Sequence, residues 1–213
     1  MNFEINKERY VSVTSAGAYY CMLNTEDDIA RNFLRARLQE KETAKLTKEN
    51  IELWFGNNDL RGLEMLNHLQ KLNWLNSSDN AHHCSTEKLE DFLPKILGNM
   101  SSQNKVLLAD THGFYISSVG FPHESAEEIS ALSADIISLH ERHKGVLNGN
   151  LKLSSSNWGM IDAAGHSQLG FWPLHVGKEI FSLVIGGRAS LNHPSFLQLA
   201  WALNSRYAKE IKC

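Results

Sequence analysis

The chain has 213 residues, 42% of them hydrophobic, so it can bury a substantial core, and its length fits one large or two small domains. The formal charge of −3 is spread evenly, since residues 1–85 carry ten basic and twelve acidic groups and the remainder carries eleven and twelve. This balance gives no basic half of the kind that nucleic-acid binding produces, and no uninterrupted apolar stretch reaches the length of a membrane span.

Cysteine usage indicates a reducing compartment. Cys21, Cys84 and Cys213 are too few and too scattered to form a disulfide framework. No positively charged start precedes an apolar signal segment. We therefore expect a cytoplasmic protein whose membrane contacts, if it has any, are made through a partner.

Helical patterns dominate the first third of the chain. Thr25-Glu26-Asp27-Asp28 is a helix-start signal, and apolar residues then recur at helical spacing to about Gln39. A second, short helix is expected over 47–55. After a turn at Gly56-Asn57-Asn58, leucines keep a three-residue spacing along a third helix over 58–73.

Two short strands complete this part of the chain, one expected within 10–20 and one at 73–76. The order of helix, short helix, turn and longer helix resembles a winged-helix domain. The segment 76–85 is polar and lacks periodicity, so we expect it to be a linker. We predict two domains, a mainly helical one over 1–80 and a second one over 86–213.

The second region has a clear order of elements. Residues 106–109 predict a strand, Asp110-Thr111-His112-Gly113 a tight turn, and 114–119 a second strand. Ser125-Ala126-Glu127-Glu128 matches a capping box at the start of a helix over 126–142. Three more strands and a last helix follow, over 151–164, 168–176, 179–185 and 194–209.

This order, the opening VLLADTHGFYISSVG and the hairpin LGFWPLHVGKEIFSLVIGG resemble the roadblock, or dynein light chain, family domain. With 88–97 as a first helix, in which Pro94 breaks one hydrogen bond, the resemblance covers roughly 86–213. It implies an α+β fold, α-β-β-α-β-β-β-α, with a five-stranded antiparallel sheet and helices on both faces. Profilin-like, PAS and GAF domains wrap helices around similar sheets and remain alternatives.

The resemblance also implies a function. In the roadblock family the corresponding helices of two subunits pair antiparallel, the two sheets join edge to edge, and bacterial members bind a Ras-like small GTPase on the paired helices. They alter hydrolysis by reshaping the GTPase, which requires only a difference in affinity between switch-loop conformations. We therefore expect a non-enzymatic regulator or adaptor that forms a homodimer or a roadblock heterodimer. Arg142 and Arg188 are the first arginines to test for a direct role.

The helix over 126–142 is the expected interface. Ile129, Leu132, Ile136 and Leu139 form a stripe that we expect to pack on the sheet. A second surface is expected to contact the partner, where small residues let another backbone come close: Glu127, Ser130, Ala131, Ala134, Ile137, Ser138 and Glu141. Alternatively, Ile137 and the alanines broaden the core stripe.

A transcription regulator is the alternative function, with the winged helix on DNA and the second domain dimerising or sensing a ligand. The third helix carries about equal numbers of basic and acidic groups. The first helix is more basic, with Arg31, Arg35, Arg37 and Lys41 partly offset by Glu40 and Glu42.

No enzyme signature emerges from the sequence. Ser, His and Asp lack a Gly-flanked nucleophile turn, and Gly186-Gly187-Arg188 lacks the Gly-Lys-Ser/Thr ending that holds phosphates, so we expect no bound GTP and no cofactor. His82-His83-Cys84 offers zinc-ligand types without a paired ligand at a suitable spacing, which favours a solvated linker over a metal site. His112 and His166 are expected in exposed turns.

Overall fold

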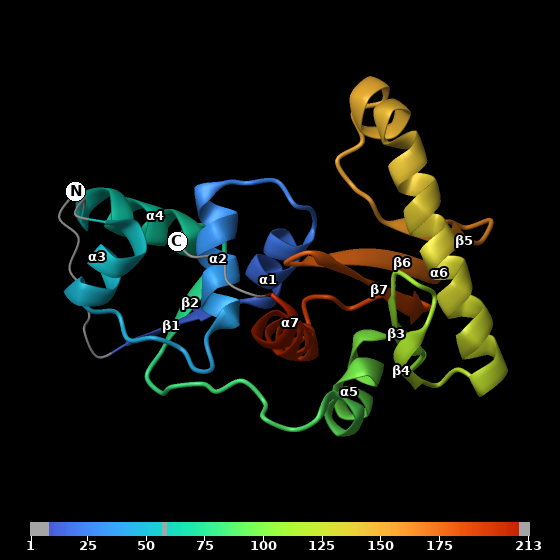
Figure 1. The fold of residues 1–213 in the computed structure, drawn as a ribbon, viewed down its shortest axis with the longest axis horizontal. Helices are drawn as coiled ribbons and strands as arrows, with labels where there is room; N and C mark the ends of the chain where they lie inside the picture. The colour runs from blue at the N-terminus through green and yellow to red at the C-terminus, as the bar shows by residue number, and fades with distance from the viewer. Residues whose placement is uncertain (1–8, 57–58, 209–213) are drawn as a thin grey trace.

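The computed structural model describes residues 9–56 and 59–208 (Figure 1). The first part of the chain contains four helices and a two-stranded antiparallel sheet. Its elements are β1 (Tyr10–Val13), α1 (Ser15–Met22), α2 (Ile29–Gln39), α3 (Lys48–Phe55), α4 (Asp59–Lys71) and β2 (Leu75–Ser78). The three predicted helices are confirmed, although residues 57 and 58 of the predicted turn lie outside the described residues. The winged-helix assignment is not confirmed.

The predicted strand within 10–20 is only partly correct, because the chain turns into helix α1 after Val13. Thr14 caps this helix, and its hydroxyl accepts a hydrogen bond from the Gly17 amide at 3.1 Å. A Cβ at Gly17 would lie 2.3 Å from the carbonyl oxygen of Trp74. Glycine therefore lets α1 pack directly on the backbone beside β2.

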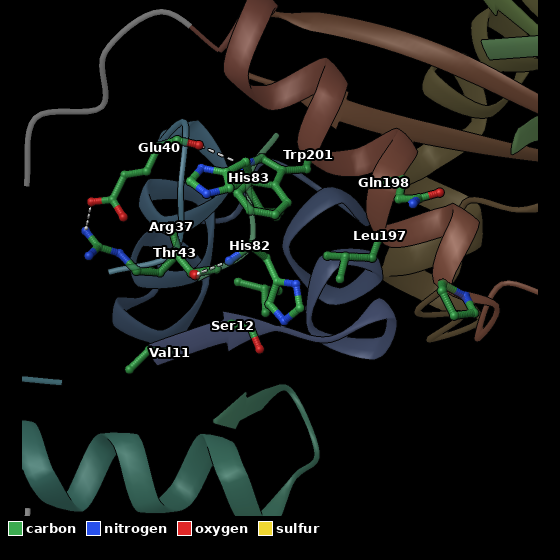
Figure 2. A pocket seen from close by; sticks show the side chains of 13 residues that line it. Val11, Ser12, Arg37, Glu40, Thr43, His82, His83, Leu197, Gln198 and Trp201 are labelled. Atoms are coloured by element: carbon green, nitrogen blue, oxygen red, sulfur yellow. Dashed lines mark hydrogen bonds and ion pairs between the residues drawn. The ribbon is translucent and has the colours of Figure 1, made fainter. Parts of the chain in front are cut away.

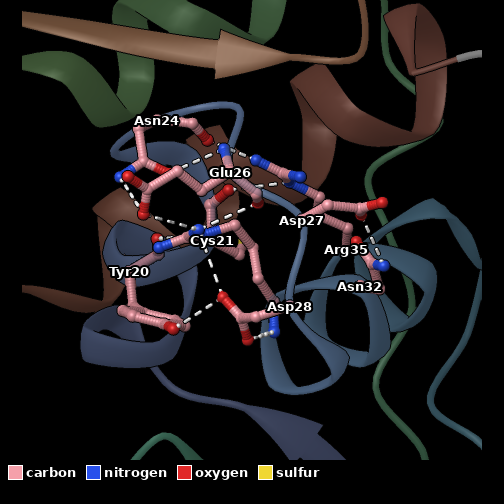
Figure 3. A network of polar contacts seen from close by, with 9 residues as sticks. Tyr20, Cys21, Asn24, Glu26, Asp27, Asp28, Asn32 and Arg35 are labelled. Carbon is pink, nitrogen blue, oxygen red and sulfur yellow. Dashed lines mark hydrogen bonds and ion pairs between the residues drawn. The ribbon is translucent and has the colours of Figure 1, made fainter.

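The α1–α2 connection is held by two buried arginines of α2 (Figure 3). Arg35 donates from Nε to the Cys21 carbonyl at 2.9 Å and also bonds the Asn24 carbonyl. Arg31 donates to the Glu26 carbonyl at 2.9 Å. The bond to Cys21 satisfies a carbonyl that the end of α1 leaves without a partner, and the other two bonds satisfy carbonyls of the connection. Burial raises the pKa of the Cys21 thiol to about 12, so this thiol is unreactive.

The second part of the chain has the predicted order of helices and strands. Its elements are α5 (Leu89–Leu97), β3 (Val106–Asp110), β4 (Tyr115–Val119), α6 (His123–Lys144), β5 (Trp158–Ile161), β6 (Ser167–Val176), β7 (Glu179–Gly186) and α7 (Pro194–Tyr207), with a 3₁₀ turn at Gly98–Met100 and a π-helical turn at Gly145–Asn150. The five strands form one antiparallel sheet in the order β4-β3-β7-β6-β5. The α+β class and the five-stranded antiparallel sheet are thus confirmed.

Two local predictions are wrong. The helix begins at His123 after Pro122, and no side chain caps it, so Ser125 lies inside the first turn and the capping box does not form. Pro122 restricts the backbone directly before the helix but has no side-chain oxygen that could accept from the first amides. The strand predicted over 151–164 is reduced to β5, because the polar residues before Trp158 form a loop.

The sheet is covered on both faces, and β3 shows how its sequence achieves this. Leu107 and Ala109 pack in the cluster under α6, whereas Val106 and Leu108 belong to the larger cluster with α5 and α7. Side chains of a strand alternate between the two faces, so a continuous apolar run fits a strand buried on both. Figure 1 shows α6 along one face of the sheet and α7 on the other.

The two halves of the chain meet at α7. Helices α1 and α2 both pack against it, and the larger cluster runs from β1 through to α7. The Trp201 indole donates to the Glu40 carbonyl at 2.7 Å, and Ser15 donates to the His193 carbonyl at 3.1 Å. The expected division at 76–85 stays a prediction, and residues 76–78 of that segment belong to β2.

A candidate interaction surface on helix α6

Helix α6 lies on the sheet through small side chains. Ala126, Ser130 and Ser133 are buried on its inner face, and Ile129 and Ile136 pack in the cluster between helix and sheet. Small residues shorten the distance between a helix and the surface below it. The inner face of α6 therefore packs in the protein's own core.

The start of this face is attached to the β3–β4 turn. Ser130 Oγ lies 2.7 Å from the carbonyl oxygen of Gly113 and 2.8 Å from that of Glu127, and its hydroxyl can donate to either. Gly113 has φ +85°, and a Cβ there would lie 3.1 Å from Cα of Ala131. The turn therefore needs glycine both for its backbone conformation and for its contact with α6.

A histidine lies on the inner face near the C-terminal end of α6. His140 is buried, and its Nδ1 accepts a hydrogen bond from the Trp158 indole at 3.2 Å. Because Nδ1 accepts, the proton of the neutral imidazole is on Nε2. This bond connects α6 to the edge strand β5.

The structure separates the predicted interface residues into three groups. Glu127, Ala131, Ser138 and Glu141 are exposed, Ala134 and Ile137 are half-buried, and Ser130 is buried. Ser130 therefore does not lie on the exposed face. The expected sheet-facing stripe is also partly wrong, because Leu132 and Leu139 point to solvent.

An apolar row runs along the solvent side of α6 and into the π-helical turn. Leu132, Leu139 and Val146 are 43%, 36% and 51% exposed, and we call these three residues the outer stripe. They are spaced by seven residues, close to two helical turns, so they lie nearly in line. Ala131 and Ser138 flank the stripe with small side chains. Sequence reasoning missed this row, although the spacing of seven was present in the sequence.

Charged residues alternate with the outer stripe. Glu128, Asp135 and Arg142 are exposed and also lie seven residues apart. None of these three side chains forms an ion pair within the described part of the chain. The outer face of α6 thus combines exposed apolar side chains with charges that form no ion pair among residues 9–56 and 59–208.

A second exposed apolar element lies at the edge of the sheet. Strand β5 pairs only with β6, and its Met160 and Ile161 are largely exposed. An edge strand with apolar side chains presents unpaired backbone groups to another chain. It is connected to α6 through the bond between Trp158 and His140.

The other predicted positions are not brought together with α6. His83 faces Glu42, with 3.4 Å between Nδ1 and Oε2. Residues 82–84 pair with 41–43 by backbone hydrogen bonds, and His82 and His83 are exposed. No group of three or more metal-ligand side chains occurs in residues 9–56 and 59–208. Arg142 lies in the last turn of α6, whereas Arg188 follows β7. His112 and His166 are exposed in their hairpin turns, as expected.

Comparison with known proteins gives a structural likeness and no sequence match. No family model and no curated protein matches the chain. Among solved structures, MglB of Myxococcus xanthus is similar at 19% identity, covering 51% of this chain and 83% of that protein, with a TM-score of 0.32. These values are too low to carry a function over. Within the described residues, no helix is both long and apolar enough to cross a membrane.

Proposed function

We propose that this protein is a non-enzymatic regulator or adaptor that dimerises through α6 and binds a Ras-like small GTPase. The observation that carries the proposal is the outer face of α6, on a helix that lies over a five-stranded antiparallel sheet. This face is an apolar row beside charges that form no ion pair with other described residues. The order of elements agrees with the roadblock domain that the sequence resembles. The GTPase part rests on that resemblance.

The outer stripe supports an antiparallel pair of α6 helices. A twofold axis near Leu139 brings Leu132 of one copy opposite Val146 of the other. The same axis brings Asp135 of each copy close to Arg142 of the other copy. Apolar contacts are thus placed in the centre, and opposite charges fix the register, as in other paired helices. Edge strand β5 is available to pair with a strand of the second copy.

Regulation of the bound GTPase would follow from selective affinity. A surface that binds one switch conformation more tightly than another shifts the equilibrium by that difference in affinity, without a catalytic side chain. The exposed Arg142 would be used in the dimer contact with Asp135. Arg188 remains the arginine to test for contact with the GTPase.

The test combines oligomeric state with nucleotide-dependent binding. Multi-angle light scattering should give twice the chain mass, and titration calorimetry with each Ras-like GTPase of the source cell should show binding in only one of two nucleotide states, GDP or a non-hydrolysable GTP analogue. Leu139→Asp should abolish both signals, and the exposed turn variant His112→Asp should change neither. Dimerisation without selective binding would reject the regulator and retain the adaptor.

The arginines of helix α2 argue against the alternative of DNA binding. Arg31 and Arg35 are buried and bond backbone carbonyls, so they are not available to phosphates. Arg37 pairs with Glu40 at 3.1 Å. Fluorescence anisotropy with a labelled duplex at low salt would still decide the question, because phosphate-driven binding would be strong there and fall steeply with added salt.

A further inference from the structure

A cavity of about 320 Å³ lies where the two halves of the chain meet (Figure 2). Its walls come from β1, the end of α2, the paired segments around Thr43 and His82, and helix α7. This volume is at the lower end of the range that small-molecule sites occupy. The cavity is far from the outer face of α6, because α7 and α6 cover opposite faces of the sheet.

The floor of the cavity is apolar. Val11, Val13 and Leu38 are buried, and the side chains of Leu197 and Trp201 from α7 complete the surface. The only hydrogen-bond donor of the indole is already used, since Trp201 Nε1 donates to the Glu40 carbonyl at 2.7 Å. Trp201 therefore offers a flat apolar ring and no polar contact, which suits a flat apolar ligand.

The polar part of the lining comprises two imidazoles, whose proton positions can be derived, together with Ser12, Arg37, Glu40, Thr43 and Gln198. Ser78 donates its hydroxyl proton to the Asn80 carbonyl at 2.9 Å, so the 3.1 Å bond between His82 Nε2 and Ser78 Oγ must be donated by histidine. His83 Nδ1 faces the Glu42 carboxylate, which only accepts. Both neutral rings thus carry their proton on the nitrogen already engaged. The second nitrogen of each ring is a hydrogen-bond acceptor without a partner in the described part of the chain.

The lining carries no net charge that would select an ion. Arg37 and Glu40 pair with each other at 3.1 Å. Burial raises the pKa of the Glu40 carboxyl, in keeping with an environment that disfavours charge. An anion would meet two acceptor nitrogens and a guanidinium that already pairs with Glu40, and a cation would lose part of its hydration to the apolar floor.

We propose that this cavity binds a small neutral molecule that has a flat apolar body and an N–H or O–H donor directed to His82 or His83. The ligand would contact both β1 and α7, so its binding would stabilise the junction between the two halves of the chain. A ligand that binds only the folded state raises the midpoint of thermal unfolding, by an amount that grows with the logarithm of ligand concentration once that concentration exceeds Kd.

Three probes that share a benzyl group test the hydrogen-bond requirement. Phenylacetamide is neutral and donates from its amide, phenylacetone is neutral with no N–H donor, and phenylacetate is an anion. Titrations followed by ¹H–¹⁵N spectra of the full chain should shift the Trp201 indole signal, identified with Trp201→Phe. Phenylacetamide should bind at least tenfold more tightly than either other probe. Equal affinity for phenylacetone, or shifts confined to other regions, would overturn the proposal.

Variants locate the site independently. His82→Phe with His83→Phe keeps flat rings and removes the acceptors, so the preference for phenylacetamide over phenylacetone should vanish. Leu197→Trp should fill the cavity and remove binding of all three probes, with folding checked by circular dichroism. His112→Gln, in an exposed turn on another part of the chain, should bind as the parent does. Unchanged binding by a folded Leu197→Trp variant would exclude this cavity.

Discussion

The hydroxyl of Ser130 lies 2.7 Å from the carbonyl oxygen of Gly113, and this contact attaches α6 to the β3–β4 turn. The serine was expected on the partner surface and instead belongs to the inner face of the helix. The neighbouring Ala131 also packs on this turn, since a Cβ at Gly113 would lie 3.1 Å from its Cα. The first half of α6 therefore lies directly on the β3–β4 turn. Because Ser130 faces the sheet, the residues on the opposite side of α6, including the outer stripe, face solvent.

The first prediction compares two glycines that have nearly the same backbone angle φ. Gly113 and Gly165 have φ of +85° and +84°, but only Gly113 has neighbours within 4 Å of an added Cβ. Gly165→Ala should cost about 1–2 kcal/mol of unfolding free energy through backbone strain alone. Gly113→Ala should cost about 1 kcal/mol more, because its Cβ would press on α6. Urea unfolding of both variants measures the difference, and equal costs would show that the contact with Ala131 is unimportant.

The second prediction concerns the charges beside the outer stripe. Asp135→Arg alone places two cations together in the proposed antiparallel pair and should shift light scattering toward the monomer mass. The double variant Asp135→Arg with Arg142→Asp restores the opposite charges and should recover the dimer. Reversal of Glu128, which has no cation opposite it in this register, serves as the matched control. A monomeric double variant would refute the register.

Much of the architecture was predictable because each local signal was strong. The hairpin at Gly113 and the short helix over 47–55 are encoded within a few residues, and the structure contains both, the helix as α3. The winged-helix resemblance rested only on the order and length of helices, which many helical folds share. The strand predicted over 151–164 begins with the polar run Ser154-Ser155-Ser156-Asn157, which favours a loop as well as a strand, and only Trp158–Ile161 forms strand β5.

The candidate site was less predictable for a physical reason. The stripe of Ile129, Leu132, Ile136 and Leu139 was chosen by hydrophobicity, but α6 packs on the sheet through Ala126, Ser130 and Ser133. Small polar residues can line a helix–sheet contact when their hydroxyls bond backbone carbonyls, as Ser133 does with Ser130 at 2.8 Å. The cavity beside Trp201 could not be found from sequence, because its walls come from segments more than 150 residues apart.

The third prediction addresses the buried arginine of α2. Arg35→Met fills a similar volume but leaves the carbonyls of Cys21 and Asn24 without this donor, which should cost about 2–3 kcal/mol. Arg188→Met replaces an exposed side chain and should change the unfolding free energy by less than about 0.5 kcal/mol. Chemical denaturation of both variants checks the contrast. A small effect of Arg35→Met would mean that water replaces the guanidinium.

The fourth prediction is a pH dependence from His175 on β6. Burial lowers the pKa of this imidazole, the Glu141 carboxylate opposes that shift, and the nearby Lys144 adds to it. Nδ1 of His175 has no hydrogen-bond partner in the described residues. The unfolded chain, with a histidine pKa of about 6.5, therefore binds a proton more readily than the folded protein.

Because the unfolded state takes up more protons, stability should fall as pH decreases below about 6.5 and should level off once pH is below the lowered folded pKa. His175→Gln removes this group, so its unfolding free energy should decline less between pH 7.5 and pH 5 than that of the parent. His112→Gln, in an exposed turn, should follow the parent profile. Urea titrations at a series of pH values provide the measurement. Parallel profiles for the parent and His175→Gln would mean that water reaches His175 and hydrates its charged form.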